Sequence, residues 1–213
     1  MNTVVFTSIF GQYDSLIEPI EHSDSIDYVC FTDNPDLVSN VWQIKVVDPY
    51  FQDDMIRSAR HHKICPHRYL EQYDFSLYVD GNMRIRLVPD VMKMLNGNTI
   101  AMEWHRKRRC LYVEAEVCKE RHLDDSMKIN RQVASYRAMG FPENAGLYAS
   151  YMIVRKHNDE RLKVLSESWW THVCAYSRRD QISLPVVFNG HPVERILSDT
   201  RRRLVTIMGH RKR

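Results

Sequence analysis

The sequence has no long apolar segment. No run of residues approaches the ~20 apolar positions that a membrane-spanning helix requires. The opening residues, 1–11 (MNTVVFTSIFG), have no basic segment, and their apolar run is interrupted within ten positions. We therefore expect neither a membrane span nor a secretion signal.

Paired cysteines are also missing. The chain has five cysteines, an odd number, and no two of them form a CxxC pair. They are Cys30, Cys65, Cys110, Cys118 and Cys174. This pattern excludes a disulfide scaffold and a zinc framework of spaced cysteines. Reduced thiols, and with them a cytoplasmic location, are the expectation.

Glycine and proline are scarce, with 7 and 8 among 213 residues, and 30 Lys and Arg nearly balance 27 Asp and Glu. With 44% hydrophobic residues, this composition excludes collagen-like, low-complexity and disordered chains. The length fits one domain, 1–213. Because no obvious closing element follows the final HRKR, the domain could be the N-terminal part of a longer protein, with further domains as partners.

Acidic residues are absent from positions 201–213, which hold six basic residues. The preceding 200 residues sum to a net charge of −3, so the positive charge of the chain belongs to a basic tail. A nucleic-acid-binding protein usually spreads positive charge over a working face, so nucleic acid is not an expected partner. An exposed basic end is the simplest interpretation, and a phosphate-binding arm is the alternative.

Short β-rich runs alternate with helical stretches along the chain. Strands are predicted at 3–9, 27–32, 42–47, 75–79, 99–102 and 147–154, and helices at 54–65, 88–95, 125–139 and 158–176. Strands separated by helices predict an α/β fold with a mostly parallel central sheet and helices on both faces. In such sheets ligands bind beyond the carboxyl ends of the strands, so the residues just after each strand are the candidates for a site.

The strongest local feature is Asp80-Gly81-Asn82, which ends the apolar run 75–79 (FSLYV). A carboxylate and an amide at that position offer the oxygen ligands that Mg²⁺ and Mn²⁺ prefer. The alternative is a plain hairpin turn, because Asp, Gly and Asn are all good turn residues.

Three cations, Arg57, Arg60 and Lys63, recur at intervals of three on the helix expected at 54–65. This spacing keeps them on neighbouring positions of one helix face. A row of cations near a metal site suits a ligand with several phosphates. A solvated face paired with Asp53 and Asp54 is the alternative interpretation.

Six blocks of the sequence, in order, resemble a known family. They are FTSIFGQYD (6–14), DYVCFTDN (27–34), ARHHKICPHRYL (59–70), YDFSLYVDGN (73–82), RCLYVEAE (109–116) and SRRDQISL (177–184). They resemble the glycosyltransferase-like domain of plant cell-wall proteins and of microbial and viral polysaccharide genes, a chlorovirus glycosyltransferase among them. The strand that ends in an acidic motif is similar to the GT-A class of nucleotide-sugar glycosyltransferases. The resemblance implies a single GT-A-like domain.

The same resemblance implies how a nucleotide-sugar donor would be bound. Thr7 and Ser8 would line the nucleotide pocket, and Asp33 would contact the base or ribose. Lys63, with Arg57 or Arg60, would reach the diphosphate or the donor sugar.

A divalent cation, Mn²⁺ or Mg²⁺, is implied as the cofactor. Asp80 and Asn82 take the place of the usual Asp-x-Asp motif, and Asn82 departs from it because an amide oxygen is a weaker ligand than a carboxylate. A late histidine supplies a further ligand in some relatives. His210 is the candidate here, and His191 is the second choice.

Asp180-Gln181 resembles the Asp-Gln motif that retaining enzymes place beside the donor sugar. A carboxylate and an amide can hold sugar hydroxyls and stabilise positive charge at the anomeric carbon, so both are candidate catalytic residues. A helix N-cap at Asp180 is the structural alternative.

Other polar and aromatic groups carry weaker expectations. His105 lies in a polar cluster that could bind the diphosphate or acceptor, or could form a surface charge network. The group His61, His62 and His67 lacks metal-like companions and is interpreted as structural or as a pocket rim. The pair 169–170 (WW) is expected in the core.

The sequence therefore predicts a metal-dependent glycosyltransferase. It would move a sugar from a nucleotide-diphosphate donor, with UDP-sugar as the expected donor, to a hydroxyl of a glycan acceptor with retention. A nucleotidyltransferase is the alternative enzyme, although 6–14 offers only one glycine for a phosphate loop. A polyanion-binding module that works through the basic tail is the non-enzymatic alternative.

Overall fold

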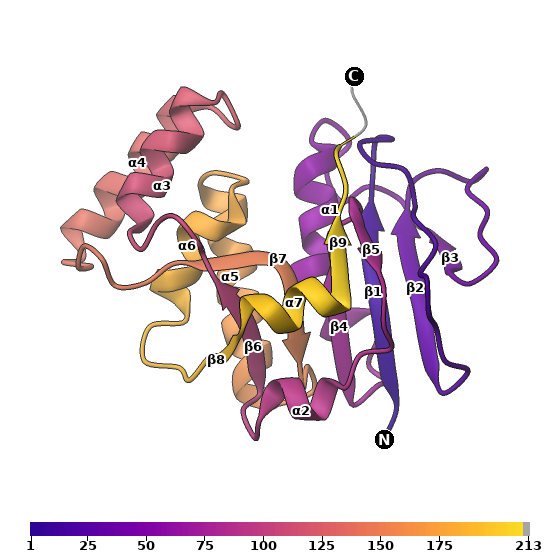
Figure 1. Ribbon diagram of the computed structural model, residues 1–213. Coiled ribbons are helices and arrows are strands. Elements are labelled where there is room, and N and C mark those ends of the chain that lie inside the picture. Colours follow the sequence, from indigo (N-terminus) through magenta and orange to yellow (C-terminus); the bar gives the residue numbers. More distant parts are fainter. Residues whose placement is uncertain (211–213) are drawn as a thin grey trace.

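The computed structural model describes residues 1–210 (Figure 1). Its centre is a seven-stranded sheet with the order β3-β2-β1-β4-β7-β6-β8. The strands are β1 (Thr3–Ile9), β2 (Ile26–Thr32), β3 (Gln43–Val46), β4 (Phe75–Val79), β6 (Ile100–Trp104), β7 (Tyr148–Arg155) and β8 (Glu194–Ile196). Four of the six pairings are parallel, and only β7 runs against both of its neighbours.

Helices cover both faces of this sheet. The longer ones are α1 (Met55–Ile64), α3 (Leu111–Glu120), α4 (Ser126–Ala138), α5 (Glu160–Ala175) and α6 (Asp180–Val187), and the shorter ones are η1 (Pro66–Arg68), α2 (Val91–Leu95) and α7 (Ser198–Leu204). The predicted α/β class with a mostly parallel sheet is confirmed.

Alternation along the central strands gives the sheet two separate cores. Phe6 and Tyr78 face the core that α1, α5 and α6 cover, whereas Val5 and Leu77 face the core that α2 and α7 cover. Successive side chains of a strand point to opposite faces, so the largely apolar strands β1 and β4 contribute to both cores. Helices α3 and α4 form a third small cluster that contacts α6 through Ile182 and stands beyond the β6 end of the sheet (Figure 1).

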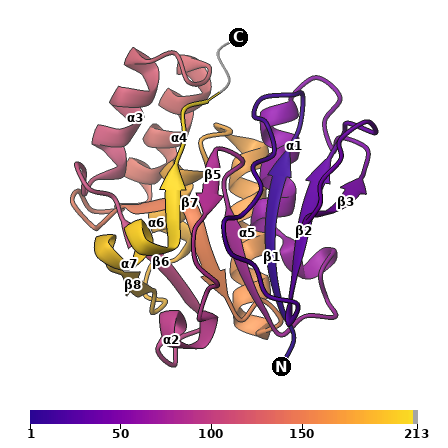
Figure 2. The same cartoon turned by 45° about the vertical axis from the view of Figure 1, so that its right-hand side comes forward.

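A second, two-stranded sheet joins β5 (Met83–Ile85), directly after β4, to β9 (Val205–Ile207) near the end of the described chain. Figure 2 shows the two strands side by side, with the C-terminal segment rising to the edge where β1 ends. This pairing brings the late residues back to the turn after β4.

The basic stretch 201–213 differs from the expected tail in its first part. Residues up to 207 belong to α7 and β9, and Arg201 is 6% exposed because it pairs with the buried Glu103. The positions 211–213 lie outside the described residues. The sequence pattern missed α7 and β9, and it also missed β5, α3 and β8.

All five cysteines are free. Within residues 1–210, no helix is long and apolar enough to cross a membrane.

Candidate functional site

A pocket of about 330 Å³ lies where β1 and β4 end. Its walls come from the ends of these strands, from α1, from the first residues of β7 and from the start of α6. Because β7 is antiparallel, its beginning lies at the same edge as the carboxyl ends of its neighbours. Eight of the predicted site residues line the pocket: Ser8, Arg60, Lys63, Asp80, His105, Asp180, Gln181 and His210.

Lys63 is the buried centre of the pocket, with 1% of its side chain exposed. Its Nζ lies 2.8 Å from Asp180 Oδ2 and 3.6 Å from Asp80 Oδ1, and it donates to Ser150 Oγ at 3.2 Å. Helix α1 places it there because Asp54 caps the helix start. The ammonium therefore joins two carboxylates that come from distant parts of the chain.

Asp180 is fully enclosed by donors. Arg60 Nε lies 3.2 Å from Oδ1, and Ser150 donates to Oδ2 at 3.0 Å. Burial alone would raise the pKa of Asp180, but Arg60 and Lys63 lower it well below its usual range. The carboxyl group is therefore ionised throughout the neutral range.

Helix α6 begins at Asp180 itself, and Arg179 holds the N-cap position. The alternative role of Asp180 as a helix cap is therefore not what the structure shows. Instead its backbone carbonyl accepts from Trp169 Nε1 at 2.8 Å, which fixes the start of α6 to the core. Gln181, next in the helix, lines the pocket and donates from Nε2 to the carbonyl of Tyr148.

Asp80 is the more open carboxylate, with 33% of its side chain exposed. The Tyr78 hydroxyl donates to Asp80 Oδ1 at 2.9 Å, and the backbone N–H of Asp80 donates to the carbonyl of Tyr151. A turn does follow, since Met83 N–H donates to the Asp80 carbonyl at 3.0 Å. The predicted turn is therefore present, and the Asp80 carboxylate at its start lines the pocket.

Three side chains that could contribute ligands to a divalent cation line the pocket. Asp80, Asp14 and His210 all line the pocket, and His210 Nδ1 lies 3.0 Å from Asp14 Oδ1. Two carboxylates and an imidazole suit Mn²⁺ or Mg²⁺ with its preference for oxygen. Gly81 leaves room for them, because a Cβ there would come within 3.3 Å of Asp14 Cβ. Within residues 1–210, however, the ligand atoms of Asp80, Asp14 and His210 do not all lie within 4.8 Å of one another, so the structure as it stands does not form a closed site for the ion.

Asn82 has a different place from the one its spacing suggested. It is 8% exposed and is absent from the pocket lining. Its Nδ2 donates to the carbonyl of Met208 at 3.1 Å and lies 3.5 Å from His210 Nε2. Asn82 thus fastens the C-terminal segment beside the turn.

Three other predicted residues also lie outside the lining. Thr7 is buried on the opposite face of β1 from Ser8. Asp33 accepts the Gly11 N–H with both carboxylate oxygens, so it holds the turn after β1. Arg57 donates to the carbonyl of Tyr176.

Ser8 contributes an unpaired polar atom. Its Oγ is buried at the pocket wall and has no hydrogen-bond partner among the described residues.

His105 lines the pocket from the loop after β6. Its Nδ1 accepts the backbone N–H of Arg108 at 2.9 Å. Burial, helped by Arg108, lowers the pKa of His105, which keeps the ring neutral. His191 bonds to Thr99 instead and is not part of the pocket lining.

Sequence reasoning missed Asp14, Ser150 and Tyr151, all in the lining. Asp14 is the last residue of the block 6–14 that carries the resemblance, in the loop after β1, and that position could have marked it. Ser150 and Tyr151 lie inside a strand pattern, where nothing distinguishes them from core residues.

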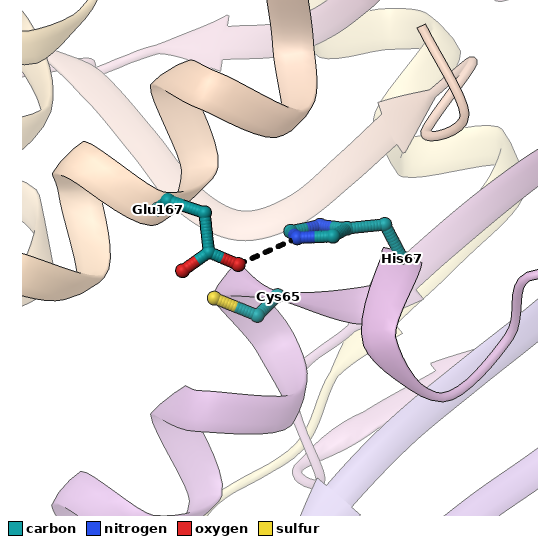
Figure 3. A group of neighbouring side chains, drawn as sticks. All are labelled: Cys65, His67 and Glu167. Atoms are coloured by element: carbon teal, nitrogen blue, oxygen red, sulfur yellow. Dashed lines mark hydrogen bonds and ion pairs between the residues drawn. The ribbon is translucent and has the colours of Figure 1, made fainter. Parts of the chain in front are cut away.

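A second polar group lies away from the pocket. Figure 3 shows Cys65, His67 and Glu167, whose ligand atoms all lie within 4.8 Å of one another, so His67 does have metal-like companions. Both oxygens of Glu167 are already bonded to Arg68, however, and His67 Nε2 lies 2.8 Å from Oε1. We interpret the group as a structural ion-pair cluster that connects η1 to α5.

Comparison with known proteins agrees with this architecture. Residues 33–205 match the family described as TOD1/MUCI70, glycosyltransferase-like domain. The probable hexosyltransferase MUCI70 of Arabidopsis thaliana is 27% identical over 161 residues, which are 69% of this chain and 27% of that protein. The chain thus spans about a quarter of the length of this curated relative.

Among solved structures, the fold is similar to the apo form of the WbbM bifunctional glycosyltransferase. The TM-score is 0.55 at 11% identity, with 92% of this chain and 38% of that chain covered. The family match extends over most of the chain, from Asp33 just after β2 to Val205 at the start of β9. The chain therefore belongs to the TOD1/MUCI70 glycosyltransferase-like domain family.

Proposed function

We propose that this protein transfers a sugar from a nucleotide-diphosphate donor, a UDP-sugar, to a hydroxyl group of a glycan acceptor. The family and the hexosyltransferase relative support glycosyl transfer. The donor, the acceptor and the use of a cation are the finer parts of the proposal.

The observation that carries the proposal is the position of Lys63 between Asp80 and Asp180 at the pocket. Arg60 adds a second cation beside Asp180. Two cations and an exposed carboxylate at one sheet edge suit a diphosphate with its bound metal ion. A diphosphate that enters the pocket can share these cations and leave as the glycosidic bond breaks.

The cation would be held by Asp80 and His210, with Asp14 beside them. When bound, Mn²⁺ or Mg²⁺ would supply Lewis-acid stabilisation of the leaving diphosphate. Among the residues of the chain, Lys63 holds the Asp80 carboxylate in place.

The proposal includes retention, and the environment of Asp180 is consistent with it. An inverting reaction needs a carboxylate base that takes the acceptor proton, and a useful base has a pKa near the working pH. The pKa of Asp180 is held far below that range by Arg60 and Lys63. Asp180 is therefore not suited to be that base. Gln181, beside it in the pocket lining, can bind sugar hydroxyls.

The test is UDP release from a panel of UDP-sugars, with glycan acceptors, in the presence and absence of Mn²⁺. The proposal expects turnover with at least one donor that requires the metal and is lost in Asp80→Ala. The exposed Asp24 serves as the matched control, and Asp24→Ala should retain activity. Absence of metal-dependent turnover across a broad panel, or full activity in Asp80→Ala, would contradict the proposal.

A further inference from the structure

One tryptophan stays at the surface beside the pocket. The chain has four tryptophans, and Trp42, Trp169 and Trp170 are at most 5% exposed, whereas Trp104 is 39% exposed. Trp104 is the last residue of β6, and β6 and β4 both run against β7, so Trp104 lies at the sheet edge that holds the pocket. His105, the next residue, lines the pocket. A large aromatic ring is thus partly in solvent beside the candidate site.

The neighbouring strand connects this ring to the pocket wall. Tyr148, at the start of β7, is the register partner of Trp104, and their ring centroids lie 6.2 Å apart at an interplanar angle of 85°. The Tyr148 carbonyl accepts from Gln181 Nε2 at 2.6 Å, and Gln181 lines the pocket. The residues that follow Tyr148, 149–151, line it as well. Trp104 is therefore joined to the pocket lining through one residue, Tyr148.

A cation lies over the same ring. Arg195 is on β8, the edge strand next to β6 (Figure 1), and its Cζ lies 5.3 Å from the centroid of the Trp104 ring. A guanidinium in this position is attracted to the aromatic face and so holds the orientation of the ring. Arg195 is exposed and, within residues 1–210, has no carboxylate partner. Its N–H groups can therefore donate to a ligand that lies against the ring.

An exposed aromatic ring with hydrogen-bond donors at its border matches the chemistry of a sugar. A pyranose presents C–H groups on its faces and hydroxyl groups around its rim. The C–H groups pack on an aromatic ring, which offers a large apolar area and loses little conformational entropy. The hydroxyl groups accept from a guanidinium. The alternative is incidental exposure, because single apolar side chains at a protein surface are common.

We propose that Trp104 and Arg195 form a subsite that binds a sugar ring of the glycan acceptor. The inference rests on the proposed function, since that function introduces the acceptor, and it adds the place where the acceptor is bound. The nucleotide diphosphate is assigned to Lys63 and Asp80, on α1 and after β4. Strand β7 separates β4 from β6 in the sheet, so a sugar at Trp104 extends the other side of the pocket and leaves the donor side open.

The first experiment needs no turnover. Because the other three tryptophans are buried, acrylamide should quench mainly the fluorescence of Trp104, and Trp104→Phe should remove the quenchable part. Neutral tetrasaccharides of glucose, galactose, mannose, xylose and arabinose serve as probes. The proposal expects at least one of them, at millimolar concentration, to protect Trp104 from acrylamide. A panel in which no tetrasaccharide protects Trp104 would overturn it.

Calorimetric titration of the protective tetrasaccharide then assigns the contact. Trp104→Ala should bind it about 5- to 10-fold more weakly than the wild type, and Trp104→Phe, which keeps an aromatic face, should lose less. Arg195→Met, which removes the N–H donors, should also weaken binding. Tyr50→Ala is the matched control and should bind like the wild type, because Tyr50 is a 52% exposed aromatic residue outside the pocket lining. Unchanged affinity in Trp104→Ala, or an equal loss in Tyr50→Ala, would overturn the subsite.

The two proposals fail in different ways. With an acceptor that supports transfer, Trp104→Ala should raise the KM for the acceptor about 5- to 10-fold and keep the KM for the UDP-sugar within about twofold. If the wild-type protein releases no UDP from any UDP-sugar, the proposed function is wrong, while tetrasaccharide binding still tests the subsite. If the wild type turns over and Trp104→Ala has an unchanged KM for the acceptor, only the inference about Trp104 is wrong.

Discussion

Lys63 Nζ lies 2.8 Å from Asp180 Oδ2, and each of these two side chains is no more than 2% exposed. The pair joins α1 to α6 beneath the pocket. A buried charge is stable only while its partner is present, so this one contact couples the fold of the domain to the chemistry of the site.

Substitution of Lys63 by Met should destabilise the protein by about 3 kcal/mol, because it removes the cation nearest to the buried Asp180 carboxylate. Chemical denaturation followed by circular dichroism measures this. Lys163→Met is the matched control, since Lys163 pairs with an 86% exposed Glu160 and should cost less than about 0.5 kcal/mol. Equal effects of the two substitutions would contradict the buried pair.

Gly81→Ala should destabilise the protein by about 1–3 kcal/mol and weaken Mn²⁺ binding. The added Cβ would collide with Ile9 and press on Asp14. Gly209→Ala meets no atom within 4 Å and should change stability by less than about 0.5 kcal/mol. A Gly81→Ala protein with wild-type stability and wild-type Mn²⁺ affinity would show that Asp14 and the turn after β4 are not in close contact.

Stability should fall as the pH drops from about 6.5 toward 4. Burial lowers the pKa of His61 to about 4, of His62 to about 3 and of His157 to about 4. The unfolded chain takes up protons at its ordinary histidine pKa of about 6.5, while the folded state remains neutral. Each such histidine therefore removes about 1.4 kcal/mol of stability per pH unit in this range.

The pH effect can be assigned with His62→Phe, because His62 stacks between Phe10 and Phe31 and a phenyl ring keeps that packing. Denaturation at pH 8 gives the packing effect of the substitution alone. Between about pH 6 and 5 the variant should lose stability less steeply than the wild type, by about 1.4 kcal/mol per pH unit. The same slope in both proteins would contradict a buried neutral His62.

The elements of the sheet were predictable where apolar runs had sharp polar limits. Strand β4 matches the expected 75–79 because acidic residues stand directly on both sides of the run. Helix α1 likewise begins after a capping aspartate, Asp54. Such end signals depend only on neighbouring residues, so they can be read from the sequence alone.

The C-terminal elements could not be predicted in this way. Three successive arginines at 201–203 indicate an exposed end. Arg201 is nevertheless buried, because it forms an ion pair with Glu103 on β6. Asn82 was predicted as a ligand from its spacing, and its actual partners, Met208 and His210, follow β9. Asp14 could not be predicted for the same reason, because its contact with His210 forms only when the C-terminal segment returns to the turn after β4.

Glu103→Gln should loosen the C-terminal segment. Glu103 is 2% exposed, forms an ion pair with Arg201 at 3.4 Å and accepts from Ser198 at the start of α7. Loss of its charge leaves Arg201 buried without a carboxylate, at a cost of about 3 kcal/mol. Hydrogen exchange should become faster across 198–207, the stretch that ends just before His210.

The control for this prediction is Asp199→Asn in the same helix. Asp199 is 83% exposed and pairs only with the exposed Arg202, so its loss should leave hydrogen exchange in the segment unchanged. If Glu103→Gln left the exchange rates as they are, the anchoring of α7 by Glu103 would be wrong.

Calorimetric titration of UDP into the protein, with and without Mn²⁺, tests most directly whether the pocket around Lys63 and Asp80 holds a nucleotide diphosphate. We expect one UDP per chain, tighter binding when Mn²⁺ is present, and loss of that gain in Asp80→Ala but not in Asp24→Ala. A wild-type protein that binds no UDP, or binds it equally well without Mn²⁺ and in Asp80→Ala, would contradict the account.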